Sequence, residues 1–141
     1  MKDITLKITG KQVYNNSEED QMEFVTEGKV YEKNGSVYVT YEESEVSGFI
    51  GCKTTLKLKD DSVKMKRFGK EGFGTELFFK EGERFQSKYD TPYGSFDVEV
   101  LTNKVDNTLN IEDLSGKIDI EYQVSLDGLR EGKNTLTIDL A

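Results

Sequence analysis

The sequence predicts an all-β protein: a single closed antiparallel up-and-down barrel of about eight to ten strands, spanning residues 1–141. Apolar side chains recur at every second position through most of the chain, as in strands that bury one face. Short turn signals separate these stretches, and no segment has the periodicity of a long amphipathic helix. A sheet of that many antiparallel strands must close or stack to protect its edges, and short turns favour closure in sequence order. A Greek-key sandwich is the alternative arrangement.

Each predicted strand rests on a set of alternating residues expected to face the interior. In chain order these sets are Ile4, Leu6 and Ile8; Met22 and Phe24; Val37, Val39 and Tyr41; Cys52, Thr54, Leu56 and Leu58; Val63, Met65 and Arg67; Phe85, Ser87 and Tyr89; Phe96, Val98 and Val100; Ile118, Ile120, Tyr122, Val124 and Leu126; and Leu136, Ile138 and Leu140. Polar residues lie between them, as expected where the other face meets water.

The turns between these strands are also visible in the sequence. Asn34-Gly35 is the strongest hairpin signal, because both central positions of such a turn favour positive φ. Further turns are predicted at Asn15-Asn16-Ser17, at Asp127-Gly128 and at Thr91-Pro92-Tyr93-Gly94. The stretch 106–116 is the least strand-like part of the chain, and a turn of helix is expected there.

Composition excludes several classes of protein. The net charge of −8 argues against a nucleic-acid partner and against an anionic membrane surface. With no histidine and one cysteine, the chain has no histidine-based catalytic triad, no Cys/His zinc site and no internal disulfide. The acidic pairs lack the spacing of a calcium loop, so neither a metal nor a cofactor is expected. No secretory or membrane-spanning stretch is present in this sequence, so a cytoplasmic location is expected.

The candidate binding residues lie on the predicted inward faces. An inward Arg67 is costly unless it is paired, and Glu43 or its neighbour Glu42 could be the partner. Arg67 could instead receive the acidic head of an apolar ligand through a bidentate fork, or reach solvent at the strand end. Three inward tyrosines either contact a ligand or fill the core. The candidate ligand-binding set is therefore Tyr41, Glu43, Arg67, Tyr89 and Tyr122.

Three functions remain open on these residues. The first is a non-enzymatic binding module for a small apolar or acidic ligand. The second is a filled structural barrel that acts in protein–protein interaction, for which a homodimer would also fit. The third is an enzyme, whose acid or base would have to be Glu42, Glu43 or a tyrosine because histidine is absent.

The chain also resembles a known family nearly from end to end. The resemblance rests on Val37-Tyr38-Val39-Thr40-Tyr41-Glu42-Glu43, on Val63-Lys64-Met65-Lys66-Arg67-Phe68-Gly69, on Tyr89 followed by Gly94-Ser95-Phe96, and on Gly116-Lys117-Ile118-Asp119-Ile120-Glu121-Tyr122. In order and spacing these segments resemble the YwiB-like family of small Bacillus and Clostridium proteins, which implies a lipocalin-like (calycin) barrel and no established activity. The Gly-x-Trp motif of secreted lipocalins and the Arg-x-Tyr pair of fatty-acid-binding barrels are both missing from this chain.

Overall fold

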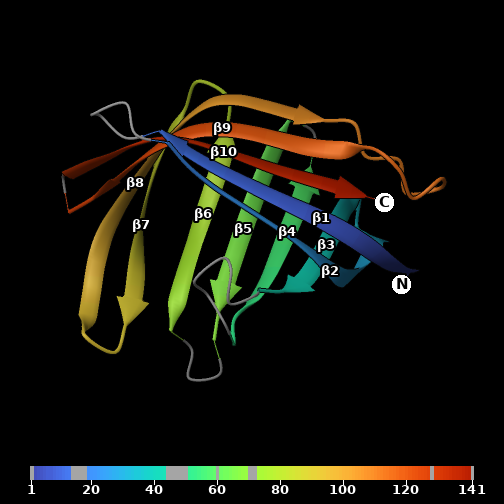
Figure 1. The fold of residues 1–141 in the computed structure, drawn as a ribbon, viewed down its shortest axis with the longest axis horizontal. Coiled ribbons are helices and arrows are strands. Elements are labelled where there is room, and N and C mark those ends of the chain that lie inside the picture. The colour runs from blue at the N-terminus through green and yellow to red at the C-terminus, as the bar shows by residue number, and fades with distance from the viewer. Residues whose placement is uncertain are drawn as a thin grey trace.

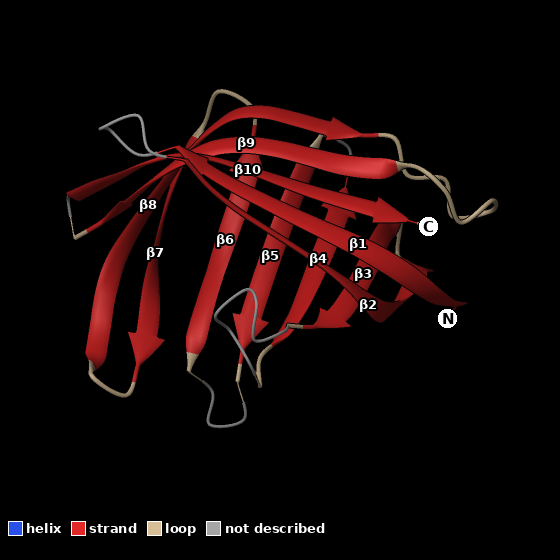
Figure 2. Ribbon diagram, viewed as in Figure 1, coloured by secondary structure: helices blue, strands red, loops and turns tan. Residues whose placement is uncertain are grey.

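A computed structural model describes residues 2–13, 19–43, 51–59, 61–69, 73–127 and 129–140; for residues 126 and 129–131 it describes the backbone only. All regular elements in these ranges are β-strands, which turns connect (Figure 2). Among these residues, no helix is long and apolar enough to span a bilayer.

In the described ranges, ten strands follow one another. They are β1 (Lys2–Val13), β2 (Glu19–Lys33), β3 (Ser36–Glu42), β4 (Lys53–Lys59), β5 (Ser62–Phe68), β6 (Gly74–Lys80), β7 (Arg84–Thr91), β8 (Gly94–Asn107), β9 (Lys117–Leu126) and β10 (Leu129–Leu140).

The strands form one closed antiparallel barrel in sequence order. Each strand pairs with the next one along the chain, and β1 closes the ring by pairing with β10 (Figure 1). The closing register sets Leu6 opposite Leu140 and Ile8 opposite Ile138, so this pairing joins two inward apolar rows. The fold class predicted from the sequence is confirmed, and the order of strands excludes the Greek-key alternative.

The barrel interior is filled by the alternating apolar residues. Every strand except β7 contributes at least one buried apolar side chain to a single core cluster, in which Leu6, Leu56 and Ile120 are fully buried. Most of the predicted inward residues lie in or against this core, but Cys52, Phe85, Ser87 and Phe96 are half-buried and outside it; the side chain of Leu126 is not described.

The turns agree with the sequence in two places and differ in one. Asn34 and Gly35 have φ of 53° and 79°, as the hairpin between β2 and β3 requires. Pro92 and Tyr93 form the turn between β7 and β8. The expected turn of helix is absent: β8 continues to Asn107, and residues 111–114 form a turn closed by an Asn110–Ser115 bridge. Residues 14–18 and 128, where turns were also predicted, lie outside the described residues.

The sequence did not predict β6. The pairing of this strand with β7 is the shortest between neighbouring strands of the barrel. Three apolar residues in a row, Leu77-Phe78-Phe79, break the alternating pattern, because Phe78 faces outward and is also apolar. The centroids of the Phe78 and Phe85 rings lie 5.7 Å apart. Only Gly74↔Asp90 and Thr75↔Tyr89 pair β6 with β7, although both strands are fully described. We call this two-pair joint the β6–β7 seam.

Candidate functional site

The candidate site is built around a buried ion pair between β3 and β5. The register places Tyr41 opposite Thr54 and Thr54 opposite Arg67, so the three side chains share one inward row. Glu43 follows the end of β3, and its backbone N–H donates to Cys52 O at 2.9 Å, which continues the β3–β4 ladder. This additional backbone hydrogen bond holds the Glu43 side chain on the same inward face.

The Glu43 carboxylate is satisfied by two neighbours. Thr54 Oγ1 donates to Glu43 Oε1 at 2.6 Å, and Arg67 Nη2 lies 3.2 Å from the same oxygen. Arg67 Nε also donates to Thr54 Oγ1 at 3.4 Å. The Glu43 side chain is 1% exposed and that of Arg67 is 16% exposed. Of the two partners considered from the sequence, the structure therefore selects Glu43; Glu42 is exposed on the outer face.

Two tyrosines lie beside this pair. By distance and angle, the buried hydroxyl of Tyr41 has no hydrogen-bond partner among the described residues. Burial raises the pKa of Tyr41 well above its usual range; the charge of Glu43 raises it further, and that of Arg67 opposes both. Burial likewise raises the pKa of Tyr122, again opposed by Arg67. Both hydroxyls therefore stay protonated at neutral pH.

Arg67 lines two separate hollows at its end of the barrel. The larger has a volume of about 400 Å³, and its other lining residues include Met22, Tyr122 and Asn134. The buried Nδ2 of Asn134 has no hydrogen-bond partner in the described part of the chain. A volume of this size lies within the roughly 300–1,000 Å³ of small-molecule sites.

The smaller hollow is more apolar in its lining. It has a volume of about 250 Å³ and lies beside the β6–β7 seam, where Phe73, Tyr89 and Pro92 line it together with Arg67. Gly74 permits this arrangement: its φ is 154°, and a Cβ there would lie 1.9 Å from Arg67 O. Cys52 also lines this hollow and is half-buried, so it is less enclosed than the core residue expected from the alternation.

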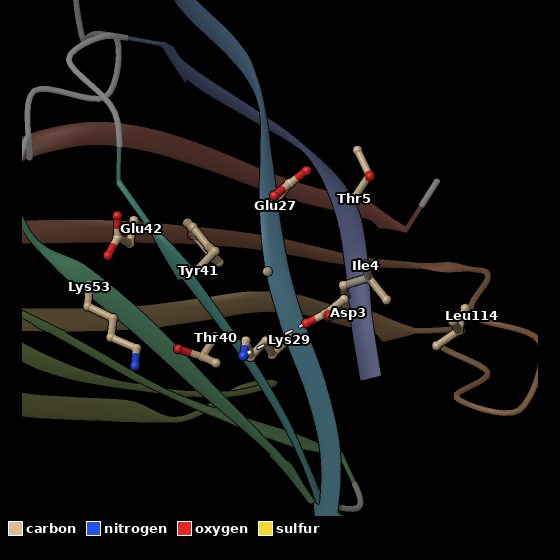
Figure 3. A pocket seen from close by; sticks show the side chains of 11 residues that line it. Asp3, Ile4, Thr5, Glu27, Lys29, Thr40, Tyr41, Glu42, Lys53 and Leu114 are labelled. Atoms are coloured by element: carbon tan, nitrogen blue, oxygen red, sulfur yellow. Dashed lines mark ion pairs between the residues drawn. The ribbon is translucent and has the colours of Figure 1, made fainter. Parts of the chain in front are cut away.

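A third and larger hollow, of about 650 Å³, lies against strands β1 to β4 (Figure 3). Residues of β1 to β4 and Leu114 line it, including the core residues Ile4 and Tyr41, and the ion pair between Lys29 and Asp3, 3.8 Å long, crosses part of it. Glu27, Glu42 and Lys53 add charges of both signs. This mixed and exposed lining suits solvent better than an apolar ligand.

The structure thus brings the five predicted residues to one end of the barrel. Tyr41 and Glu43 lie at the ion pair, while Tyr122 and Tyr89 line the hollows on either side of Arg67. Sequence reasoning missed the role of Thr54, which bridges both members of the pair, and that of Asn134. Thr54 could have been found as a hydroxyl on an apolar face; Asn134 gave no such signal. Among the described residues, no group of three acidic or cysteine side chains could hold a metal.

Comparison with known proteins places this barrel in a family. The family model described as a domain of unknown function, DUF1934, matches residues 6–138. The chain belongs to this family. Over 120 residues it is 27% identical to the uncharacterized beta-barrel protein YwiB of Bacillus subtilis (strain 168), covering 85% of this chain and 80% of the relative. The resemblance inferred from the sequence is therefore confirmed.

A solved structure agrees with the fold. The crystal structure of the YwiB protein from Bacillus subtilis superposes with a TM-score of 0.77 at 22% sequence identity. The match covers 99% of this chain and 93% of that one. At this identity the comparison supports the barrel and not a shared activity.

Proposed function

We propose that this DUF1934 protein is a non-enzymatic binding module for a small, largely apolar ligand. The single observation behind the proposal is that Arg67 lines two hollows while its guanidinium is already paired with Glu43. A paired guanidinium still presents an oriented polar surface, but the pair as a whole carries little net charge. It therefore favours an apolar ligand with one polar or weakly acidic group over a strongly charged one.

The remaining lining supports the same ligand class. Phe73, Tyr89 and Pro92 offer apolar surface in the smaller hollow, and Tyr122 and Asn134 offer polar tips in the larger one. Glu43 is the buried carboxylate of the pair, and Thr54 and Arg67 already engage it; Asp20 and Asp90 line the two hollows as exposed residues. The proposal therefore assigns Glu43 a structural role and no part in acid–base chemistry.

The first experiment is mass spectrometry of the protein purified gently from its own or a related cell. We expect an extra mass that survives native conditions and disappears on denaturation, which would identify the ligand class. In parallel, titration with a fluorescent fatty acid such as cis-parinaric acid, an apolar chain with one weakly acidic group, should show one saturable site per folded chain.

Two variants separate a role of Arg67 from an effect of charge. Arg67→Lys keeps the charge but loses the fork, so it should weaken binding of the fluorescent fatty acid about tenfold. Lys66→Gln removes a cation from the next position of β5, which faces outward, and should leave the affinity unchanged. Equal affinities for both variants would remove Arg67 from the site. A clean native mass without saturable binding of the fatty acid would reject the binding function.

The filled interior favours one second candidate. Among the residues whose side chains are described, twenty buried apolar residues form the core, which is what a purely structural barrel requires. In that case the protein acts through its outer surface, for instance as a homodimer. Light scattering that shows a monomer at high concentration would eliminate the homodimer.

A further inference from the structure

The outer face of the barrel carries a concentration of positive charge that the net charge of −8 conceals. The outward positions of β4 are Lys53, Thr55, Lys57 and Lys59, and those of β5 are Ser62, Lys64, Lys66 and Phe68. These eight positions hold five lysines and no acidic residue. We call the five lysines the lysine face; the two strands that carry it are green in Figure 1.

The lysines are arranged at a cost to the folded protein. The register sets Lys57 directly opposite Lys64, and like charges so placed destabilise a pair of strands. Glu76 on β6 relieves Lys64, with 3.4 Å between Nζ and Oε1. Among the described residues, the other four lysines make no ion pair. The register also sets Glu42 opposite Lys53 and Glu76 opposite Lys66, so the positive charge without an acidic residue opposite it is that of Lys57 and Lys59.

Aromatic rings stand at both ends of the central row of this face. The row runs across five strands as Tyr31, Tyr38, Lys57, Lys64 and Phe78. The rings of Tyr31 and Tyr38 are stacked, with centroids 4.9 Å apart and planes 9° from parallel. Lys57 Nζ lies 5.9 Å from the centroid of Tyr38.

We propose that the lysine face binds single-stranded nucleic acid. Proteins that bind single strands without sequence preference combine cations that follow the phosphates with aromatic rings on which bases stack. Both components lie here on one twisted antiparallel sheet, within one row of outward residues. An acidic protein segment would use the lysines but would not need the rings, so the observations favour the nucleic acid. Affinity depends on the local field of this face, which is opposite in sign to the whole chain.

The test measures fluorescence anisotropy of a labelled oligothymidylate of about 16 nucleotides with the full-length protein. We expect binding at about 50 mM salt that weakens steeply by about 200 mM. The double variant Lys57→Gln/Lys66→Gln should weaken binding at least tenfold. It should also lower the salt slope by about 1.4, since each lost contact to a single-stranded phosphate removes about 0.7.

A matched variant controls for total charge. Lys7→Gln/Lys133→Gln removes two exposed cations from β1 and β10 and should bind as the natural protein does. Equal weakening by both double variants would overturn the proposal, because the effect would then follow net charge alone. Absence of binding by the natural protein at low salt would overturn it directly.

A second pair of variants tests the rings. Tyr38→Thr keeps a strand-forming residue and should weaken oligonucleotide binding about tenfold by removing a stacking surface. Tyr93→Thr removes an aromatic ring that is 94% exposed in the β7–β8 turn and should have no effect. If Tyr38→Thr binds normally and polyglutamate competes as well as oligonucleotide does, the face binds acidic polymers and the proposal is wrong. Urea unfolding confirms that each variant is folded before it is compared.

Discussion

At the scale of single residues, the ion pair between Glu43 and Arg67 has consequences beyond the site. A buried charge without its partner is far more costly than a buried pair, typically by about 3–5 kcal/mol. Glu43 is the more enclosed of the two, so the barrel depends on Arg67 to pair with that carboxylate in the interior. The same guanidinium that lines both hollows therefore also supports the fold.

This dependence predicts a specific pattern in a double-mutant cycle. Arg67→Met should lower the free energy of unfolding by about 3 kcal/mol, since it leaves Glu43 buried and charged. Adding Glu43→Gln should recover part of that loss, because the amide can still accept from Thr54 without carrying a charge. Urea denaturation of the two single variants and the double variant measures the coupling, and additive losses would contradict it.

The Tyr41 hydroxyl predicts a second effect, which depends on pH. Its folded pKa lies above the ordinary value of about 10, so stability is unaffected below that pH and falls as the unfolded tyrosine ionises above it. Tyr41→Phe should therefore lose less stability between about pH 8 and pH 11 than the natural protein does. Tyr31→Phe, on the outer face, is the matched control. Identical pH profiles for all three proteins would show that Tyr41 does not contribute.

At the scale of elements, the β6–β7 seam is the place where the ring is least closed. Two residue pairs join these strands, whereas seven pairs join β5 to each of its neighbours. The β6–β7 turn is held from another direction: Gly82 N–H donates to Thr102 O at 2.9 Å, and Thr102 N–H donates to Glu83 O at 3.2 Å. The turn therefore contacts β8 while the two strands separate beyond Thr75.

The seam predicts uneven hydrogen exchange among the strands. Backbone amides of β7 should exchange faster than those of β5, because β7 has a full ladder on one side only and no buried side chain. Exchange followed by mass spectrometry compares peptides that cover the two strands. Equal protection would show that the seam is closed in solution.

The strands that the sequence predicted and the one that it did not differ for a physical reason. Alternating apolar and polar residues indicate a strand with one solvent-exposed face. This pattern located nine of the ten described strands, through residues such as Ile4, Val39 and Ile138. It failed on β6 because Phe78 has an aromatic contact on the outer side, so three apolar residues occur in a row. The Arg67–Glu43 pairing followed from the inward register, but the smaller hollow beside it depends on how β7 departs from β6.

At the scale of the whole molecule, the ring joins residues from the two ends of the chain. β1 pairs with β10 over eight residue pairs, so the first strand completes its hydrogen bonding only when the last one is in place. The buried residues of one core cluster come from nine of the strands, and Tyr89 of β7 packs against it, which supports a single cooperative unit.

This closure predicts unfolding in one step. Urea unfolding followed by tyrosine fluorescence and by far-ultraviolet circular dichroism should give coincident transitions, as expected for a single domain of residues 1–141. The seven tyrosines report from both the interior and the surface, since the chain has no tryptophan. A separate early transition in one probe would show that part of the barrel, such as the β7–β8 hairpin, unfolds independently.

The β6–β7 seam also bears on how such a protein avoids aggregation. A closed sheet presents no edge to other molecules, but a ring that opens at one joint becomes an open sheet with two. At this joint the exposed edge would be β6, whose Leu77-Phe78-Phe79 run has the composition of segments that pair between chains. The charged residues Glu76 and Lys80 flank that run. Natural sequences commonly place charges beside an apolar strand, where they oppose its pairing with other chains. Together with the mutual repulsion of chains that carry a net charge of −8, they protect the molecule when its weakest joint opens.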